Sequence, residues 1–382
     1  MKKILTISLL LFLIFNNGFA QSKYTDSLSV ELNKAMNDTS RVLILADLSY
    51  YHRYQNLDTA LAYAQRTLSL SKKISFSRGE SISYQVMGVS YRLKGELSRS
   101  LEHIYKALQI AEDNNYKSEI AYCFMRLSLV FSDLKDFDKA ISLIQKSFQI
   151  FGSEKRIRVN AINNLQSSNN FEGLNKLDTA WYYAEKAYNQ LDIIEDLTSD
   201  VCRSAGNIQF KTGNRLLSFK FYKEAYDYAL SQNDYRSISL VYAQLAIVYR
   251  KENNRDSSIY YAKQGLEYAQ RSSNRRGILA CGNLLAEIYE VENPADALRF
   301  YKIAAEAKEG LFGTGNLQAI QALLVKEEER QNEIERAKAV YQAQLKQYGL
   351  LGIVVVFLVV ALPLYRNNQN RKKTNEQLLQ QN

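Results

Sequence analysis

The sequence predicts an all-α protein, in which a solenoid of helical hairpins is followed by a long coiled-coil-like helix that runs into a single transmembrane helix. Three observations predict this fold class. The chain has 382 residues with only two prolines and with 27 tyrosines, a composition typical of packed amphipathic helices. One sequence pattern recurs about every 40 residues, as it does in helical repeat proteins. An uncharged apolar stretch lies near the C-terminus.

The N-terminus has the organisation of a signal peptide over residues 1–20. Lys2 and Lys3 precede a short apolar run, and Gly18 and Ala20 place small residues at the expected cleavage site. The run of about twelve apolar residues is too short to span a bilayer. Residue 21 is Gln and not Cys, so we expect no N-terminal lipid anchor. Residues 21–40 are expected to form a lead-in or capping helix.

The repeat occupies residues 41–311 in about seven copies. In each copy, a short polar turn precedes a small residue that begins the inner face of an aromatic-rich helix. In the second copy, Gly88 marks where the two helices approach closely, and Gly95 in the turn is free to adopt a positive φ. Gly206 corresponds to Gly88 in the fifth copy. The small landmark residues, spaced by 40, 40, 40, 38, 40 and 39, are Ala60, Ser100, Ala140, Ala180, Ser218, Ser258 and Ala297.

Over residues 41–310 this pattern resembles the tetratricopeptide repeat (TPR) family. The period is longer than the usual 34 residues, and the family's common proline at the end of each repeat is missing. The resemblance implies that each helix pair packs on its neighbours, because no pair can bury its own apolar face alone. It also implies that the first helices line a concave groove for a peptide. The residues that carry it include Gly88, Tyr91 and Ser100; Ser128, Phe131 and Ala140; Gly206, Ser218 and Tyr222; Ala246, Tyr249 and Ser258.

The three cysteines do not predict disulfides. Cys123, Cys202 and Cys281 are separated by 79 and 79 residues, which places them at equivalent positions on first helices of alternate copies. Stacked helices lie about 8–10 Å apart, beyond the roughly 7 Å between Cα atoms that a disulfide allows. We expect all three to be small core residues.

The pattern breaks after the last copy, and residues 312–347 are expected to form a connector and a long charged helix. The apolar residues of this helix, such as Leu317, Leu324 and Leu345, fit a heptad seam that polar residues interrupt, for example at Glu327 and Lys338. A conditional coiled coil, which would make the chain a dimer, and a solvated single helix both fit this pattern.

Residues 348–365 are predicted to span a membrane. These 18 residues carry no charge and would extend about 27 Å as a helix, close to the thickness of a bilayer core. Tyr348 and Tyr365 flank the stretch, and a basic cluster follows at once in residues 366–382. By the positive-inside rule, this places the repeats on the extracytoplasmic side and the tail in the cytoplasm.

The sequence offers no material for an enzyme or a cofactor site. There are two histidines, His52 and His103, and no phosphate-binding or HExxH motif. We therefore expect no catalytic residue, no metal and no cofactor. The formal net charge is +9, but about five of these charges belong to the two ends. The remainder is too small for a nucleic-acid-binding surface.

One candidate binding surface is present. Arg203, Asn207 and Lys211 follow one another at four-residue spacings on one face of a first helix, and Arg92 and Arg250 lie at comparable places on other first helices. Such a stripe can hold the carboxylates of an acidic peptide. It partly resembles the carboxylate clamp of chaperone-binding TPR domains.

Other residues depart from that clamp. Ala280 and Leu284 stand where further basic residues are expected, and Asp133, Glu172 and Glu290 interrupt the basic stripe. A solvated charged face is therefore the competing interpretation of these residues.

Taken as a whole, the arrangement is similar to the exported TPR sensor half of bacterial membrane histidine kinases or regulators, with no effector domain after the membrane helix. This resemblance implies an input module that binds a peptide or protein partner in its groove and acts on a cytoplasmic kinase or regulator. A passive envelope scaffold or assembly protein, without signalling output, is the alternative.

Overall fold

The computed structural model describes residues 19–53, 56–151 and 157–381. The predicted signal peptide, residues 1–20, lies almost entirely outside these residues. The described chain is helical and divides into two units, Met1–Leu323 and Leu324–Asn382. The prediction of an all-α chain is confirmed.

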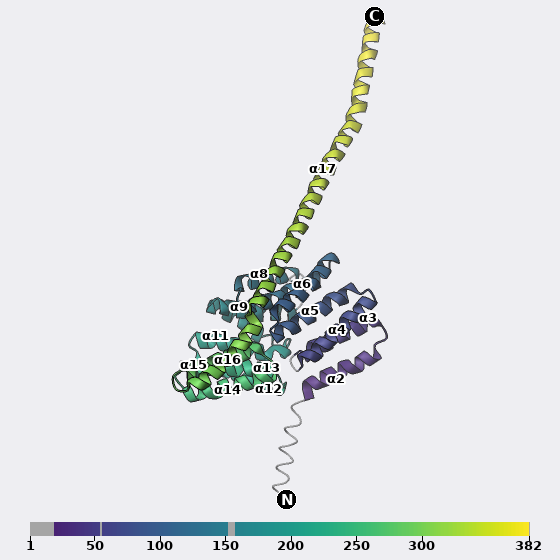
Figure 1. The fold of residues 1–382 in the computed structure, drawn as a ribbon. Helices are drawn as coiled ribbons and strands as arrows, with labels where there is room; N and C mark the ends of the chain where they lie inside the picture. The colour runs from purple at the N-terminus through teal and green to yellow at the C-terminus, as the bar shows by residue number, and fades with distance from the viewer. Residues whose placement is uncertain (1–18, 54–55, 152–156, 382) are drawn as a thin grey trace. The chain divides into compact units, whose positions relative to one another are not determined.

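The first unit contains α2 (Phe19–Lys34) and seven antiparallel helix pairs among its described residues (Figure 1). A short 3₁₀ helix, η1 (Glu195–Leu197), lies between the fourth and fifth pairs. The pairs, which we number as copies 1 to 7, are α3 (Asp38–His52) with α4 (Leu57–Lys73), α5 (Ser77–Lys94) with α6 (Leu97–Asp113), α7 (Lys117–Asp133) with α8 (Phe137–Phe151), α9 (Ile157–Gly173) with α10 (Leu177–Tyr188), α11 (Thr198–Lys211) with α12 (Arg215–Ser231), α13 (Tyr235–Lys251) with α14 (Arg255–Arg271), and α15 (Arg275–Tyr289) with α16 (Pro294–Phe312).

The first helices form a continuous layer. Each one packs on its own second helix and also on the first helix of the next copy, from α3 through to α15. Stacking of this kind is how a solenoid buries faces that no single pair can cover. Residues on the free side of this layer therefore line the inner surface of the solenoid.

The predicted close approach within a pair is present at Gly88. The Ser100 hydroxyl donates a hydrogen bond of 2.8 Å to the carbonyl oxygen of Gly88. A Cβ on Gly88 would lie 2.5 Å from Cγ1 of Ile104, so only glycine fits. In copy 6, Ser258 donates the same bond to Ala246. All the landmark residues are completely buried except Ala297, which is partly exposed in the last copy.

Contacts between rings, four of them stacked and one tilted, hold the two helices of a pair together. An aromatic or histidine ring recurs on every first helix about 40 residues apart, and in five copies it contacts a ring three residues after the landmark. Ring contacts of this geometry add about 0.5–1.5 kcal/mol each to burial. The pairs and their centroid distances are His52–Tyr63 (5.3 Å), Tyr91–His103 (4.9 Å), Phe171–Tyr183 (5.6 Å), Tyr249–Tyr261 (5.3 Å) and Tyr289–Phe300 (5.8 Å).

Left-handed residues end the helices at intervals of about 20 residues. Gly95 has a φ of 82° and Gly213 a φ of 86°, as the sequence predicted for Gly95. At seven further turns the same backbone conformation is held by residues that bear a side chain. They are Ser75, Asn115, Lys135, Asn175, Asn233, Asn253 and Ser273.

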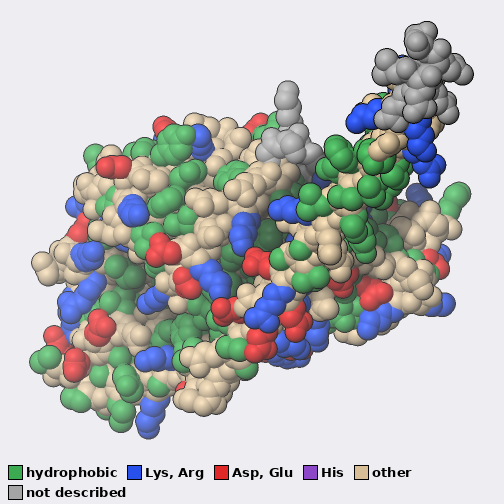
Figure 2. Space-filling view, turned by 90° about the horizontal axis from the view of Figure 1, so that it is seen from above, with side chains coloured by type: hydrophobic (Ala, Val, Ile, Leu, Met, Phe, Trp, Pro, Cys, Tyr) green, Lys and Arg blue, Asp and Glu red, His purple; other side chains and the backbone are tan. Residues whose placement is uncertain are grey.

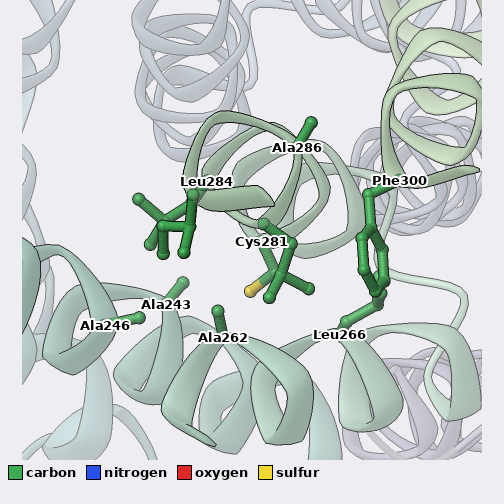
Figure 3. Close-up of a cluster of buried hydrophobic side chains, with 10 residues drawn as sticks. Ala243, Ala246, Ala262, Leu266, Cys281, Leu284, Ala286 and Phe300 are labelled. Atoms are coloured by element: carbon green, nitrogen blue, oxygen red, sulfur yellow. The ribbon is translucent and has the colours of Figure 1, made fainter. Parts of the chain in front are cut away.

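The three cysteines are buried and free. Cys281 lies in a core cluster built from both helices of copies 6 and 7, where Ala243, Ala262, Leu266 and Phe300 surround it (Figure 3). Burial raises the pKa of the Cys202 and Cys281 thiols to about 12. The cysteines are therefore core residues, as their spacing predicted.

The long helix α17 (Thr314–Gln381, 68 residues) begins in the first unit, and its part from Leu324 onward makes up the second unit. Only Gly313 separates α16 from α17. One 18-residue window of this helical region has a mean hydropathy of 2.5 and is not buried against any part of the described chain. Figure 2 shows these hydrophobic side chains along α17, followed by Lys and Arg. By length and composition, the helix is compatible with a single membrane span.

Candidate functional site

The inner surface of the solenoid carries a cluster of charged side chains from five first helices. Asp133 accepts hydrogen bonds from Nε and Nη2 of Arg92, at 2.6 and 3.1 Å. The same carboxylate accepts from both terminal nitrogens of Arg276, which lies 143 residues further along the chain. We define the central ion cluster as Arg92 (α5), Asp133 (α7), Asp200 and Arg203 (α11), Arg236 (α13) and Arg276 (α15).

Burial and charge act together on these groups. Burial lowers the pKa of Arg276 to about 10, although Asp133 opposes this change. The pKa of Asp200 is lowered, because the positive charges of Arg203 and Arg236 outweigh the effect of its own burial. The Nη2 atom of Arg203 donates to Asp200 at 2.9 Å.

Contacts between copies 2 and 7 close the inner surface. Nη2 of Arg276 donates to the carbonyl oxygen of Arg92 at 3.2 Å, and Nη1 of Arg275 donates to that of Lys94 at 3.3 Å. The next residue, Gly95, lies so near Leu311 that a Cβ would be 2.7 Å from Cδ2 of that leucine. We call these interactions the copy 2–copy 7 contact.

A second group of charges surrounds Asp196, which belongs to η1. Arg158 of α9 donates to Asp196 at 2.8 Å, and the Tyr50 hydroxyl of α3 donates to it at 3.2 Å. Arg53 forms an ion pair with the same carboxylate at 3.5 Å and lies over the Tyr50 ring. Copies 1 and 4 are thus connected through one carboxylate of η1.

Arg126 of α7 stands apart from the other inner arginines. It makes no hydrogen bond and no ion pair with any described residue, and its Nε atom is buried without an acceptor. Its nearest ring is Tyr122, 5.8 Å from the guanidinium carbon. Burial lowers the pKa of Arg126, against the influence of Cys123, Tyr50, Glu119 and Tyr122.

Glu119, the acidic residue two turns before Arg126 on α7, already has partners. Glu119 is almost completely buried and accepts from Arg78 at 2.9 Å and from Gln85 at 3.1 Å. Both carboxylate oxygens are therefore used by α5, and neither bonds to Arg126.

A small polar cavity lies beside the central ion cluster. Asp200, Ser199 and Asp234 line it together with Tyr228 and Gln232, and its volume of about 10 Å³ would hold one water molecule. The Ser199 hydroxyl is buried and has no hydrogen-bond partner among the described residues. The three carboxylates that line it, Asp196, Asp200 and Asp234, already contact arginine or serine. The cavity is also too small to hold a ligand larger than water.

The structure places the five residues of the predicted binding surface in different environments. Arg92 and Arg203 belong to the central ion cluster. Asn207 accepts a hydrogen bond of 2.9 Å from the Tyr222 hydroxyl, and Lys211 forms an ion pair of 2.6 Å with Glu172. Arg250 is exposed near the end of α13, and none of its described contacts joins it to the other four.

Sequence reasoning missed the groups that hold this surface together. In the sequence Asp133 and Glu172 interrupt a basic stripe, whereas in the structure they are the partners of Arg92 and Lys211. Arg126, Arg158, Arg236 and Asp196 were not recognised at all. The positions of the three arginines on first helices of the repeat could have indicated an inner location, but not which residues meet across it.

Among the described residues no group of three or more His, Cys, Asp and Glu side chains is placed to hold a metal ion. Fold and site together define a helical-hairpin solenoid whose inner surface is lined with arginine–carboxylate pairs.

Comparison with known proteins refines this class. No protein-family model matches the chain, and no curated protein matches it. Solved structures resemble it at low sequence identity. The Rap conjugation gene regulator of the plasmid pLS20, in complex with the Phr* peptide, is 15% identical, with a TM-score of 0.58 and coverage of 76% of this chain and 77% of the regulator.

Two further structures resemble the chain to a similar degree. NprR in complex with its cognate peptide NprX is 12% identical, with a TM-score of 0.54 over 75% of this chain and 81% of NprR. A Rap protein complexed with Competence and Sporulation Factor is 13% identical, with a TM-score of 0.51 over 80% and 98% of the two chains. These likenesses confirm the predicted TPR-like fold.

Proposed function

We propose that this chain is a membrane-anchored TPR-like binding module whose inner surface takes an acidic peptide or an acidic segment of a protein. One observation carries the proposal: arginine side chains outnumber carboxylates within the connected charge clusters of that surface. In the central ion cluster with Asp234, in the group around Asp196, and in the group of Arg78, Glu119 and Arg126, eight guanidinium groups meet five carboxylates; Lys211 and Glu172 form one further pair. The arginines are Arg53, Arg78, Arg92, Arg126, Arg158, Arg203, Arg236 and Arg276, and the acids are Glu119, Asp133, Asp196, Asp200 and Asp234.

A surplus of guanidinium groups favours carboxylate ligands, because arginine binds them through two parallel charge-assisted hydrogen bonds. The resemblance to peptide complexes of Rap and NprR is consistent with an elongated ligand in the solenoid. In the proposal, Arg92 and Arg203 contact the acidic ligand within the central ion cluster. Asn207, Lys211 and Arg250 provide further polar contacts toward the C-terminal ends of their helices.

The test uses the full chain in detergent micelles and a positional-scanning library of synthetic peptides, read by fluorescence polarisation. Peptides rich in Asp and Glu should bind, and their affinity should fall with added salt. The matched control is the same peptides with Asn and Gln at the acidic positions. If the double variant Arg203→Gln and Lys211→Gln binds the acidic peptides with unchanged affinity, the prediction that these two residues of α11 contact the ligand is wrong. Equal binding of the acidic and amide series would contradict the proposal.

The anchoring part of the proposal takes residues 1–20 as a signal peptide, 348–365 as the membrane span and 366–382 as a cytoplasmic tail. Cysteines introduced at Leu216, which is 87% exposed, and at Asn370 would be labelled with a membrane-impermeant maleimide. Labelling of Leu216→Cys in intact spheroplasts and of Asn370→Cys only after lysis is the expected result. The native cysteines are buried and give little background. The reverse pattern would overturn the orientation.

We further propose that the module is the input part of a signalling system, with a passive scaffold as the second candidate. Tyr341, Leu345 and Tyr348 of α17, which are exposed and spaced four and three residues apart, suit a self-dimer that could carry a signal. Photo-crosslinking in cells from Leu378 and Leu379, followed by mass spectrometry, discriminates the two functions. Capture of a kinase or transcription regulator supports signalling, and capture of envelope proteins alone supports the scaffold.

A further inference from the structure

Seven of the eight inner arginines have a carboxylate beside them, and Arg126 does not. Arg53 and Arg158 contact Asp196, Arg78 contacts Glu119, Arg92 and Arg276 contact Asp133, and Arg203 contacts Asp200. Arg236 lies near Asp200 and Asp234, where its charge acts on both carboxylates. Within the described chain, Arg126 has neither an ion pair nor a hydrogen bond.

A partly buried guanidinium without an acceptor is unfavourable for the folded chain. Arginine loses hydration when it leaves water, and only a carboxylate or several carbonyl groups can replace what is lost. The Nε of Arg126 is buried and donates to nothing, and the nearest acid on its own helix, Glu119, is held by Arg78 and Gln85. The inner surface therefore offers one positive charge whose partner is not part of the described protein.

Arg126 is partly exposed on the layer of first helices, within reach of a ligand that enters the solenoid. It lies on α7, one copy along from Arg92 on α5, and its charge is close enough to the Tyr50 hydroxyl of α3 for the two groups to influence each other. Tyr50 in turn bonds to Asp196 of η1. Arg126 thus lies in the same layer of first helices as the central ion cluster.

We propose that Arg126 is the anchor for a carboxylate group of the bound peptide. The inference rests on the proposed function and names the group by which the ligand is recognised. The planar guanidinium can accept a carboxylate in a two-point contact, and a ring on one side, Tyr122, limits the directions of approach. The carboxylate comes either from an Asp or Glu side chain or from the C-terminus of the peptide.

The first test needs no ligand. In the full chain in micelles, Arg126→Leu removes a charge without a partner and should raise the denaturant midpoint of the first unit. Arg203→Leu is the matched comparison, because it removes an arginine of the same surface whose carboxylate, Asp200, then stays buried alone. Its midpoint should fall. If Arg126→Leu lowers the midpoint as much as Arg203→Leu, then Arg126 is an internal structural residue and the inference is overturned.

The second test uses an acidic peptide selected from the synthetic library described above. Its affinity should fall at least tenfold in Arg126→Leu and less in Arg126→Lys, which keeps the charge but loses the two-point contact. Arg99→Gln, an exposed residue of α6 that pairs with Glu96, is the control and should bind like the unchanged chain. A peptide with an amidated C-terminus distinguishes the two carboxylate sources.

The outcomes separate the two proposals. If an acidic peptide binds and Arg126→Leu binds it equally well, the anchor is wrong while the proposed function stands. If no acidic peptide binds the unchanged chain, the proposed function fails, and the anchor fails with it.

Discussion

At Gly88 the two helices of copy 2 come so close that no side chain can stand between them. The substitution Gly88→Ala places a methyl group 2.5 Å from Ile104 and 3.3 Å from the carbonyl oxygen of Ser100. Overpacking of this kind typically costs about 1–3 kcal/mol, although alanine itself favours a helix. We expect Gly88→Ala to lower the free energy of unfolding, measured with urea. Gly315→Ala, where nothing lies within 4 Å, is the control and should cause no loss.

The buried thiols predict a loss of stability at alkaline pH. Cys202 and Cys281 have pKa values of about 12 in the folded chain, raised mainly by burial from an ordinary value of 9.0. Only the unfolded chain releases these protons easily, so the stabilisation is complete below about pH 9 and is lost progressively as the pH rises toward 12. Each thiol contributes a slope of about 1.4 kcal/mol per pH unit in that window.

The measurement is a series of urea unfolding curves between pH 8 and pH 11 on the full chain. Tyrosines also titrate at high pH, so the comparison is with Cys281→Ala, which removes one thiol and leaves them unchanged. We expect a shallower alkaline decline in Cys281→Ala. Parallel curves for the two proteins would contradict the assignment of the slope to this thiol.

At the scale of the element, the turns show how a helix can end without glycine. Lys135 adopts a φ of 62°, a left-handed conformation that costs roughly 1 kcal/mol for a residue with a Cβ. Lys135→Gly should therefore stabilise the protein by about 0.5–1 kcal/mol, seen as a higher urea midpoint. Lys176→Gly is the control, because Lys176 has a φ of −89° and gains nothing from glycine. A lower midpoint in Lys135→Gly would show that its side chain has an unrecognised role.

The helices could be predicted well from the sequence because the same pattern of residues occurs in seven copies. A small residue every 38 to 40 positions predicts where each second helix begins to pack, and Gly88 and Gly95 predict the close approach and the turn. The ring contacts were harder to see. Their partners, such as Phe171 and Tyr183, lie 11 or 12 residues apart on opposite sides of a turn, a spacing that matches neither the helical period nor the repeat period.

For the whole molecule, the copy 2–copy 7 contact is the feature with the strongest expected effect on stability. Asp133 is 9% exposed and holds Arg92 and Arg276 together. Asp133→Asn leaves two guanidinium groups facing each other without a negative charge, which should cost about 3–5 kcal/mol. Urea unfolding measures this loss. Lys106→Gln, which breaks an exposed pair with Glu102, should cost less than about 1 kcal/mol.

A loss in Asp133→Asn no larger than that in Lys106→Gln would show that the ion pairs across the inner surface add nothing. A double-mutant cycle of Arg92→Gln with Asp133→Asn then measures the Arg92–Asp133 pair, between copies 2 and 3, separately from the Arg276–Asp133 pair, which involves copy 7.

The candidate site could be predicted only in part, and the reason lies at this scale. Arg92 and Arg203 were recognised because they repeat on first helices. Asp133 and Arg276 are 143 residues apart in the sequence. Whether their side chains meet depends on how far each copy is rotated relative to the one before. Such small rotations add up over five copies and leave no local signal in the sequence. The same argument explains why Arg126 was not identified: its distinguishing property is a missing partner.

The copy 2–copy 7 contact has a consequence for how this chain can change through gene duplication and deletion. In an open helical array, a copy can be gained or lost with little harm, since each copy touches only its neighbours. Here Lys94 and Gly95 must meet Arg275 and Leu311, and a gain or loss of one copy between them would move those partners out of register. The number of copies between the second and the seventh is therefore under selection in its own right, and related chains should differ in copy number at the ends of the array, before copy 2 or after copy 7.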